Sequence, residues 1–253
     1  MTATLPKMEP DAETTATLDR RTIRGEILVV LALSVLASAA YAIVSLASAP
    51  IKGTVVESAS QNPLFANQLI GFVFGLAPVA LVIHLLHRDG ETVAAIGLDV
   101  RDARRDVVRG VLLFAVVGSI GLGIYILAVR HGVNRFVVPA PPPGHWWTWP
   151  TVVMNASGAA FLEEVVVLAY LITRLRQLAW SPMAVIAASA LLRASYHLYQ
   201  GWGGFVGNLL MGALFALLFL RWRRAWPFVV CHFLIDAVAA GGWLLLHGRV
   251  PGT

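Results

Sequence analysis

Two adjacent acidic residues, Glu163 and Glu164, lie in the middle of an apolar stretch that runs from Phe161 to Leu168. The composition of this stretch predicts a helix inside a lipid bilayer, where a charged side chain costs at least roughly 2.5 kcal/mol. On an α-helix the two side chains would point about 100° apart, since there are 3.6 residues per turn. We therefore expect one glutamate to face a chemical site and the other to face a neighbouring helix.

Two imidazoles and a further acid follow on the next apolar stretches. His232 and Asp236 are four residues apart and so share one helix face. His197 precedes a glycine-rich break, and alone it fits an interfacial aromatic cluster with Tyr196 and Tyr199. Acids and imidazoles that converge in a membrane can activate water by general acid–base chemistry. The alternative for the glutamates is an ion-paired or hydrogen-bonded contact between helices.

The composition indicates what positions these residues. The chain has 253 residues, of which 58% are hydrophobic and 13% charged, and its mean hydropathy is +0.73. These values predict one all-α domain, a polytopic transmembrane helical bundle in contact with the lipid bilayer. Cys231 is the only cysteine, so an internal disulfide is excluded. The net charge of +5 comes from arginines in short loops, which indicates membrane orientation and not nucleic-acid binding.

The apolar stretches and the arginine-rich loops predict the topology. We expect an amino-terminal disordered cytoplasmic tail over 1–24 and a transmembrane domain over 25–250. Alternating arginine content places the amino terminus in the cytoplasm and the carboxyl terminus outside. The charged segment 87–109 is predicted to be a surface amphipathic segment or a solvated loop, and the loop 130–150 is expected outside the cell. About seven spans are predicted, at about 26–49, 66–86, 108–129, 151–175, 182–198, 205–220 and 227–246.

Three short motifs resemble those of a known family. Residues 163–168 read E-E-V-V-V-L, residues 193–197 read R-A-S-Y-H, and residues 232–236 read H-F-L-I-D. Their order and spacing resemble the CPBP (Abi) family of intramembrane proteases, which includes the type II CAAX prenyl endopeptidases. The family motifs are written E-E-x-x-x-R, F-x-x-x-H and H-x-x-x-N/D. The resemblance extends over about 95–240.

The resemblance implies a hydrolase: an endopeptidase in the cell membrane of a bacterium. Its expected substrate is a lipidated or membrane-associated peptide, or a membrane protein. Carried over to this sequence, Glu163 is the general base and His197 helps to hold the attacking water. His232, and Asp236 when protonated, donate to the oxyanion, and Glu164 is structural or tunes its neighbour. Family members are also described as metalloproteases. The expectation is thus either no cofactor, which we favour, or zinc held by Glu163, His197 and His232.

Two positions depart from the family pattern. Leu168 stands where the family has arginine, and Arg193 stands where it has phenylalanine. Arg193 is one turn before His197, and we hypothesise that it replaces the lost charge by pairing with Glu164 as a bidentate donor. The alternative is that Arg193 extends to the membrane surface.

Two other functions compete with the protease. A catalytically inactive family member, acting as a membrane binding partner or chaperone, follows if nothing replaces the arginine missing at Leu168. A proton-coupled transporter would also use buried acids and histidines. Transporters usually contain an internal repeat, and none is evident in this sequence.

Overall fold

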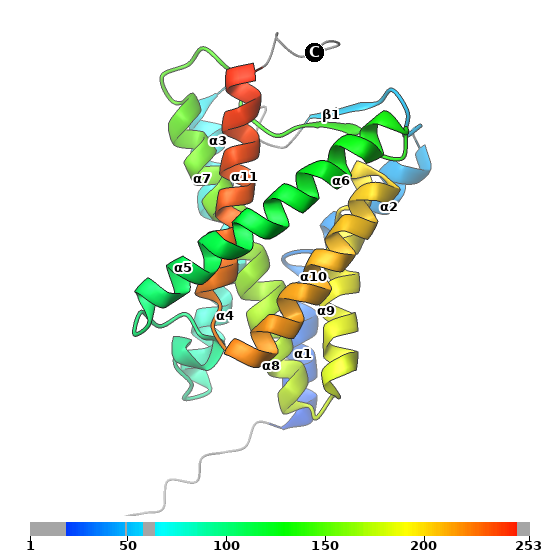
Figure 1. The fold of residues 1–253 in the computed structure, drawn as a ribbon. Coiled ribbons are helices and arrows are strands. Elements are labelled where there is room, and N and C mark those ends of the chain that lie inside the picture. The colour runs from blue at the N-terminus through cyan, green and yellow to red at the C-terminus, as the bar shows by residue number, and fades with distance from the viewer. Residues whose placement is uncertain (1–18, 49, 58–63, 247–253) are drawn as a thin grey trace, which may run out of the picture.

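The computed structural model describes residues 19–48, 50–57 and 64–246 as an all-α helical bundle (Figure 1). The first half contains α1 (Arg20–Ala32), α2 (Leu36–Ser48), α3 (Phe65–Gly75), α4 (Ala77–Arg88), the 3₁₀ turn η2 (Val93–Ile96), α5 (Ala103–Leu113), the π-helix η3 (Phe114–Gly118) and α6 (Ser119–Arg130). The second half contains α7 (Thr148–Phe161), the π-helix η4 (Leu162–Tyr170), α8 (Leu171–Gln177), α9 (Pro182–Tyr196), the 3₁₀ turn η5 (Leu198–Gln200), α10 (Trp202–Trp222) and α11 (Trp226–Leu246).

Five continuous helices in the described part of the chain are long and apolar enough to cross a membrane, which indicates a multi-pass membrane protein. The pair α1 and α2, bent by 50°, raises the number to six if it forms one span. The expected number of about seven is not confirmed, because α9 has only 15 residues. At 1.5 Å per residue it rises about 22 Å, which is less than the roughly 30 Å of a hydrocarbon core.

The predicted tail over 1–24 falls partly outside the described residues, which begin at 19. Within the described part, α1 starts at Arg20, so residues 20–24 are helical and not disordered. The helix forms this early because Ile23, Ile27 and Val30 recur on one face and are buried in the main core.

Two segments that lie between the predicted spans contain short strands. β1 (Val55–Glu57) and β2 (Phe136–Val138) pair in parallel, with Val55 opposite Phe136. The pairing joins residues about eighty positions apart, so it cannot be read from local periodicity. It holds the loop before α3 against the loop before α7 at one end of the bundle (Figure 1).

The charged segment 87–109 is not one amphipathic element. It contains the end of α4, the turn η2, a loop and the start of α5. The loop is fixed to the connection between α10 and α11, since the Gly97 carbonyl accepts a hydrogen bond from the Ala225 amide at 3.0 Å. Arg224 in that connection bonds Asp99 and Asp106, each at 2.6 Å.

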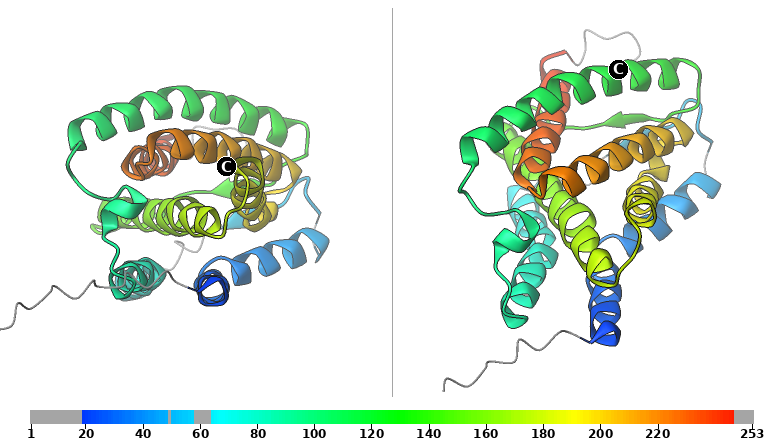
Figure 2. Two further views of the ribbon diagram at one scale, coloured as in Figure 1. Left: turned by 90° about the horizontal axis from the view of Figure 1, so that it is seen from below. Right: turned by 60° about the horizontal axis from the view of Figure 1, so that its bottom comes forward.

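The helices form layers, and the layer that holds Glu163 and Glu164 is in the middle. Seen from below, α5 and α6 form the outer layer on one side, α10 and α11 lie next to them, and α1 and α4 lie on the far side of α7 and α8 (Figure 2). In an apolar stretch of 18 residues within Thr148–Gln177, 56% of the stretch is buried inside the bundle. The corresponding share for Ala103–Arg130 is 6%. The side chains of Val165, Val166 and Cys231 are fully buried in the core. The long α5–α6 helix therefore faces lipid over most of its surface.

Candidate active site

The two glutamates lie on the π-helix η4, inside the long helix formed by α7, η4 and α8. A π-helix bonds each amide to the carbonyl five residues earlier, so its turn is wider than that of an α-helix, and such turns are frequent at functional sites. α9 packs against this turn, where the Ser189 hydroxyl donates to the Val167 carbonyl at 2.9 Å. The side chain of Glu163 is 13% exposed and that of Glu164 is 0% exposed. Glu163 is therefore the less deeply buried member of the pair.

Glu164 is held by two donors from two other helices. Arg193 Nη2 lies 2.6 Å from Glu164 Oε1, and His232 Nδ1 lies 2.7 Å from the same oxygen. Glu164 Oε2 is buried and has no hydrogen-bond partner within the part of the chain that the structure describes. These contacts are those of a carboxylate that joins η4 to α9 and α11.

Arg193 bridges the two glutamates. Its side chain is 1% exposed, and its Nη1 lies 3.3 Å from Glu163 Oε2 while Nη2 contacts Glu164. The guanidinium also lies over the ring of Phe215, with 5.6 Å from Cζ to the ring centroid. This burial rules out the alternative that the Arg193 side chain extends to the membrane surface. The bidentate pairing with Glu164 alone that we expected is wrong in detail, because each carboxylate receives one nitrogen.

Tyr196 is a site residue that the sequence analysis assigned only to an aromatic cluster. Its hydroxyl donates to Glu163 Oε2 at 2.8 Å. Tyr196 follows Arg193 by three residues, so the two share a face of α9. That spacing from an arginine expected near the glutamates was the available signal.

His197 ends α9 beside this cluster. Its Nδ1 lies 3.0 Å from the Arg193 carbonyl oxygen, which can only accept, so Nδ1 carries the proton and a neutral ring has its lone pair on Nε2. The ring lies between those of Tyr196 and Tyr199, with centroid distances of 4.8 and 6.3 Å. It interacts electrostatically with Glu163. His197 is therefore oriented by its own helix and leaves Nε2 for a ligand.

His232 and Asp236 come from α11, as their shared helix face suggested. His232 Nε2 lies 3.4 Å from Asp236 Oδ2, while Nδ1 contacts Glu164. The Asp236 side chain is 38% exposed. The imidazole thus lies between a buried carboxylate and a more accessible one.

The residues that could hold a metal ion differ from the expected zinc set. Ligand atoms of Glu163, Glu164 and His232 all lie within 4.8 Å of one another, and His197 is not in this group. Carboxylate and imidazole are zinc ligands. Here, however, Glu164 Oε1 already contacts Arg193 and His232, and the Arg193 guanidinium places a positive charge within 3.3 Å of both carboxylates, where a metal cation would be repelled. With Arg193 in place, this donor set does not fit a resident zinc ion.

Comparison with known proteins identifies the same region. The family model described as Rce1-like, type II CAAX prenyl endopeptidase Rce1-like, matches residues 145–238. No curated protein and no solved structure matches the chain. The matched region lies inside the predicted extent of about 95–240 and includes every residue of the site described above. This match over residues 145–238 confirms the predicted resemblance to the CPBP (Abi) family of intramembrane proteases, which includes the type II CAAX prenyl endopeptidases.

Proposed function

We propose that the protein is an intramembrane endopeptidase that hydrolyses a peptide bond in a lipidated or membrane-associated peptide. The observation that supports this most is the arrangement around Glu163: it is the less deeply buried glutamate of the pair, and it is fixed by Tyr196 and Arg193. The Rce1-like match supports a protease of the CAAX type.

In the proposed mechanism, Glu163 and His197 together hold the attacking water. Water donates one hydrogen to the Glu163 carboxylate and the other to His197 Nε2, which directs an oxygen lone pair at the scissile carbonyl carbon. As the C–O bond forms, Glu163 takes the water proton. The same proton then goes to the leaving amine as the C–N bond breaks, which returns Glu163 to its carboxylate form.

His232 is proposed to stabilise the oxyanion. Because Nδ1 donates to the acceptor-only carboxylate of Glu164, Nε2 carries a hydrogen only when the ring is protonated. The imidazolium is stabilised by Glu164 on one side and Asp236 on the other. Its Nε2–H would then donate to the oxygen that becomes negative in the tetrahedral intermediate.

The experiment uses purified protein in proteoliposomes and a fluorogenic peptide with a prenylated cysteine near its carboxyl end, together with its unprenylated twin. Glu163→Gln and His197→Ala should each lower the cleavage rate on the order of 10²-fold or more, because they remove the base and a water ligand. His131→Ala, at an exposed position after α6, is the matched control and should cleave normally. Wild-type cleavage by Glu163→Gln would refute the mechanism.

Chelators provide a second arm of the test. Activity should persist after treatment with a zinc chelator, since no step needs a metal. Loss of activity that added zinc restores would instead assign the cluster of Glu163, Glu164 and His232 to a metal.

A catalytically inactive binding partner is the second candidate, and Leu168 in place of the family arginine favours it. Arg193 weighs against it, because a guanidinium contacts both glutamates despite that departure. Failure of the wild-type protein to cleave a broad peptide panel, with the fold intact, would favour this candidate.

A further inference from the structure

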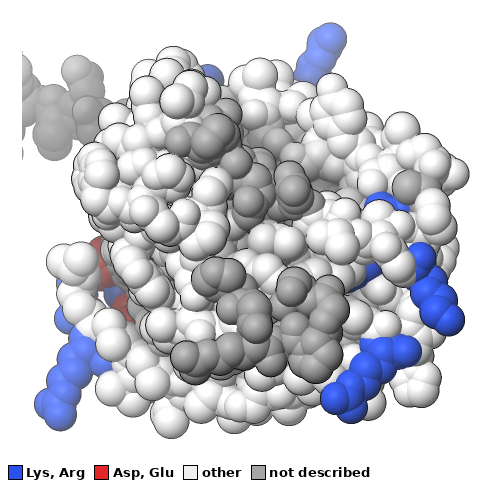
Figure 3. Space-filling model, turned by 90° about the horizontal axis from the view of Figure 1, so that it is seen from above, with Lys and Arg blue, Asp and Glu red and all other residues white. Residues whose placement is uncertain are grey.

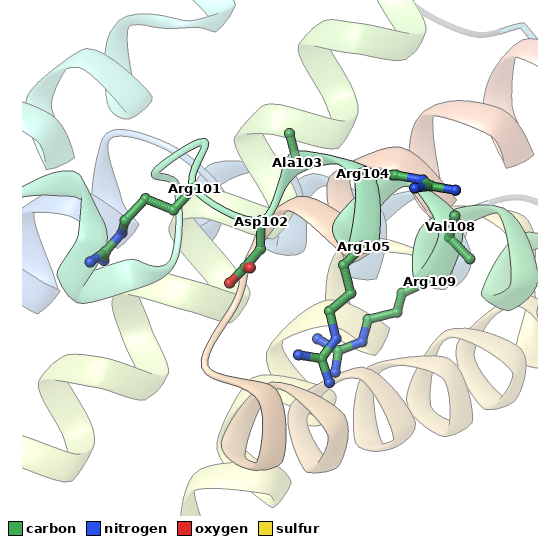
Figure 4. A pocket seen from close by; sticks show the side chains of 7 residues that line it. All are labelled: Arg101, Asp102, Ala103, Arg104, Arg105, Val108 and Arg109. Atoms are coloured by element: carbon green, nitrogen blue, oxygen red, sulfur yellow. The ribbon is translucent and has the colours of Figure 1, made fainter.

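A hollow of about 330 Å³ lies between the start of α5 and the end of α10, away from the candidate active site. We call it the arginine hollow; it is lined by Asp102, Arg105, Arg109, Arg221, Trp222 and Arg224. A second hollow of about 550 Å³, lined by residues 101–105, 108 and 109, adjoins it along α5. The view of this second hollow shows the Arg105 and Arg109 side chains extending together toward the same space, while Arg104 points away (Figure 4).

Three of these arginines have no acidic partner. Among the described residues, no carboxylate oxygen lies within 4.0 Å of a guanidinium nitrogen of Arg105, Arg109 or Arg221. Arg224 differs, because Asp99 and Asp106 already neutralise it. Like charges brought together without a counter-charge repel one another, so the hollow favours an anion.

The surroundings of the arginine hollow are apolar and face lipid. Arg109 lies over the ring of Trp222, with 4.7 Å from Cζ to the centroid, and tryptophan is typical of the membrane interface. Farther along α5, Leu112 is 63% exposed and Val111 is 45% exposed. A molecule with an anionic head in the hollow could therefore lay a hydrocarbon chain along α5 and α6.

The described residues at the opposite end of the molecule show no such concentration. Seen from the end where α11 finishes, the face is mostly uncharged, with Lys and Arg at its rim (Figure 3). The arginine hollow is thus a local feature of one end of the bundle.

We propose that the arginine hollow binds the phosphate of an anionic phospholipid headgroup, with the acyl chains lying against α5 and α6. Arginine suits this ligand because its planar guanidinium donates two parallel hydrogen bonds to phosphate oxygens. Basic pockets between membrane helices bind such headgroups elsewhere. Inorganic phosphate shares the chemistry of the head but gains nothing from the apolar face of α5.

The test measures thermal unfolding of the purified protein in a neutral detergent as phosphatidylglycerol is titrated in. Phosphatidylglycerol should raise the unfolding temperature in a saturable way, while phosphatidylcholine with the same chains and millimolar inorganic phosphate should not. Arg105→Gln with Arg109→Gln should weaken the apparent affinity about tenfold or more. Asp102→Asn should strengthen it, because it removes a carboxylate from the lining.

The matched control is Arg104→Gln with Arg130→Gln, which changes the net charge equally but leaves the arginine hollow intact. Wild-type affinity for phosphatidylglycerol in this control supports the site. An equal loss of affinity in both double variants overturns the proposal, because it would show that the lipid is attracted only by the protein's net positive charge. Equal stabilisation by inorganic phosphate, or no effect of phosphatidylglycerol on the wild type, also overturns it. Because all variants change exposed or half-exposed side chains, unfolding temperatures without lipid should agree and show that each variant folds.

Discussion

At the scale of single residues, Arg193 performs a task that lysine could not. Its planar fork presents one nitrogen to each of two carboxylates that belong to consecutive residues, Glu163 and Glu164. A lysine ammonium is a compact charge on one nitrogen, so it could not present a separate nitrogen to each carboxylate. The family pattern puts an arginine on the glutamate helix, at the position of Leu168, whereas in this protein the guanidinium that contacts both glutamates belongs to α9.

Arg193→Leu should therefore destabilise the protein, because it leaves a fully buried carboxylate without its cation. We expect a loss of roughly 3–5 kcal/mol in unfolding free energy, measured by denaturation in detergent, with loss of cleavage. The double variant Leu168→Arg with Arg193→Phe restores the family pattern and should recover much of both. A nearly silent Arg193→Leu, or a double variant no better than the single one, would contradict the replacement of the family arginine by Arg193.

The acids and histidines were predictable from residue type alone, since few ionisable side chains occur in apolar stretches. The role of Tyr196 was not, because a tyrosine near a membrane interface is ordinary. Only the wider turn of η4 and the close packing of α9 bring the Tyr196 hydroxyl to Glu163. The partner of Arg193 could be named as a hypothesis, but its bridging geometry depends on where both carboxylates point.

At the scale of elements, one glycine lets the loop before α5 approach the connection between α10 and α11. Gly97 has a φ of +69°, and a Cβ there would lie 2.4 Å from the Arg224 Cα. Both the backbone conformation and the contact exclude a side chain. The loop and the connection are thereby locked at the edge of the arginine hollow.

Gly97→Ala should lower the unfolding temperature far more than Gly90→Ala, which is the matched control. Gly90 has a similar φ of +73°, but a Cβ there meets nothing within 4 Å. The control should lose only the cost of the left-handed conformation, roughly 1 kcal/mol. Equal losses in the two variants would show that the backbone at Gly97 moves away without penalty.

The pH dependence of stability should reveal the ion pairs of this loop. Hydrogen bonds from Arg101 and Arg224 lower the pKa of Asp99 from its ordinary 3.8. The folded value lies below the unfolded one, so this stabilisation is present above pH 3.8 and is lost as the pH falls further. In acid titrations of unfolding free energy, Asp99→Asn should lose less stability below that pH than the wild type. Arg101→Gln should lie between them, and identical profiles would contradict the assignment.

Most span positions followed from the sequence, because long apolar stretches leave few alternatives to a helix. The break of the first stretch between α1 and α2 did not, and neither did the pairing of β1 with β2. Both depend on what lies beside the segment: Val35 and Ala39 turn toward Val167 and Tyr196, and the two strands satisfy each other. A local pattern contains no information on such neighbours.

At the scale of the whole molecule, a buried ion-pair network joins helices that are distant in the sequence. Arg174 on α8 is fully buried and contacts Asp89 at 2.6 Å and Glu91 at 3.0 Å. Arg88, beside Asp89, also bonds Glu26 on α1. The network thus ties α1 and the end of α4 to the helix that continues from the glutamates.

Arg174→Met should destabilise the bundle by roughly 3–5 kcal/mol, because it removes the cation shared by two carboxylates. Limited proteolysis should then cut near the junction of α4 and η2 at lower protease concentration. Arg176→Met is the matched control, since this exposed arginine on the same helix bonds only the Trp180 carbonyl among the described residues. Equal behaviour of both variants would mean that the network does not hold these helices together.

The burial of Cys231, in the core beside His232, has a practical consequence for labelling chemistry. Because the sequence has no other thiol, the native protein should not react with water-soluble maleimides. A cysteine placed in any exposed loop would then be the single reactive group, without the need to remove a native one first. Labelling intact cells and opened membranes with such variants would report directly which end of the bundle faces the cytoplasm.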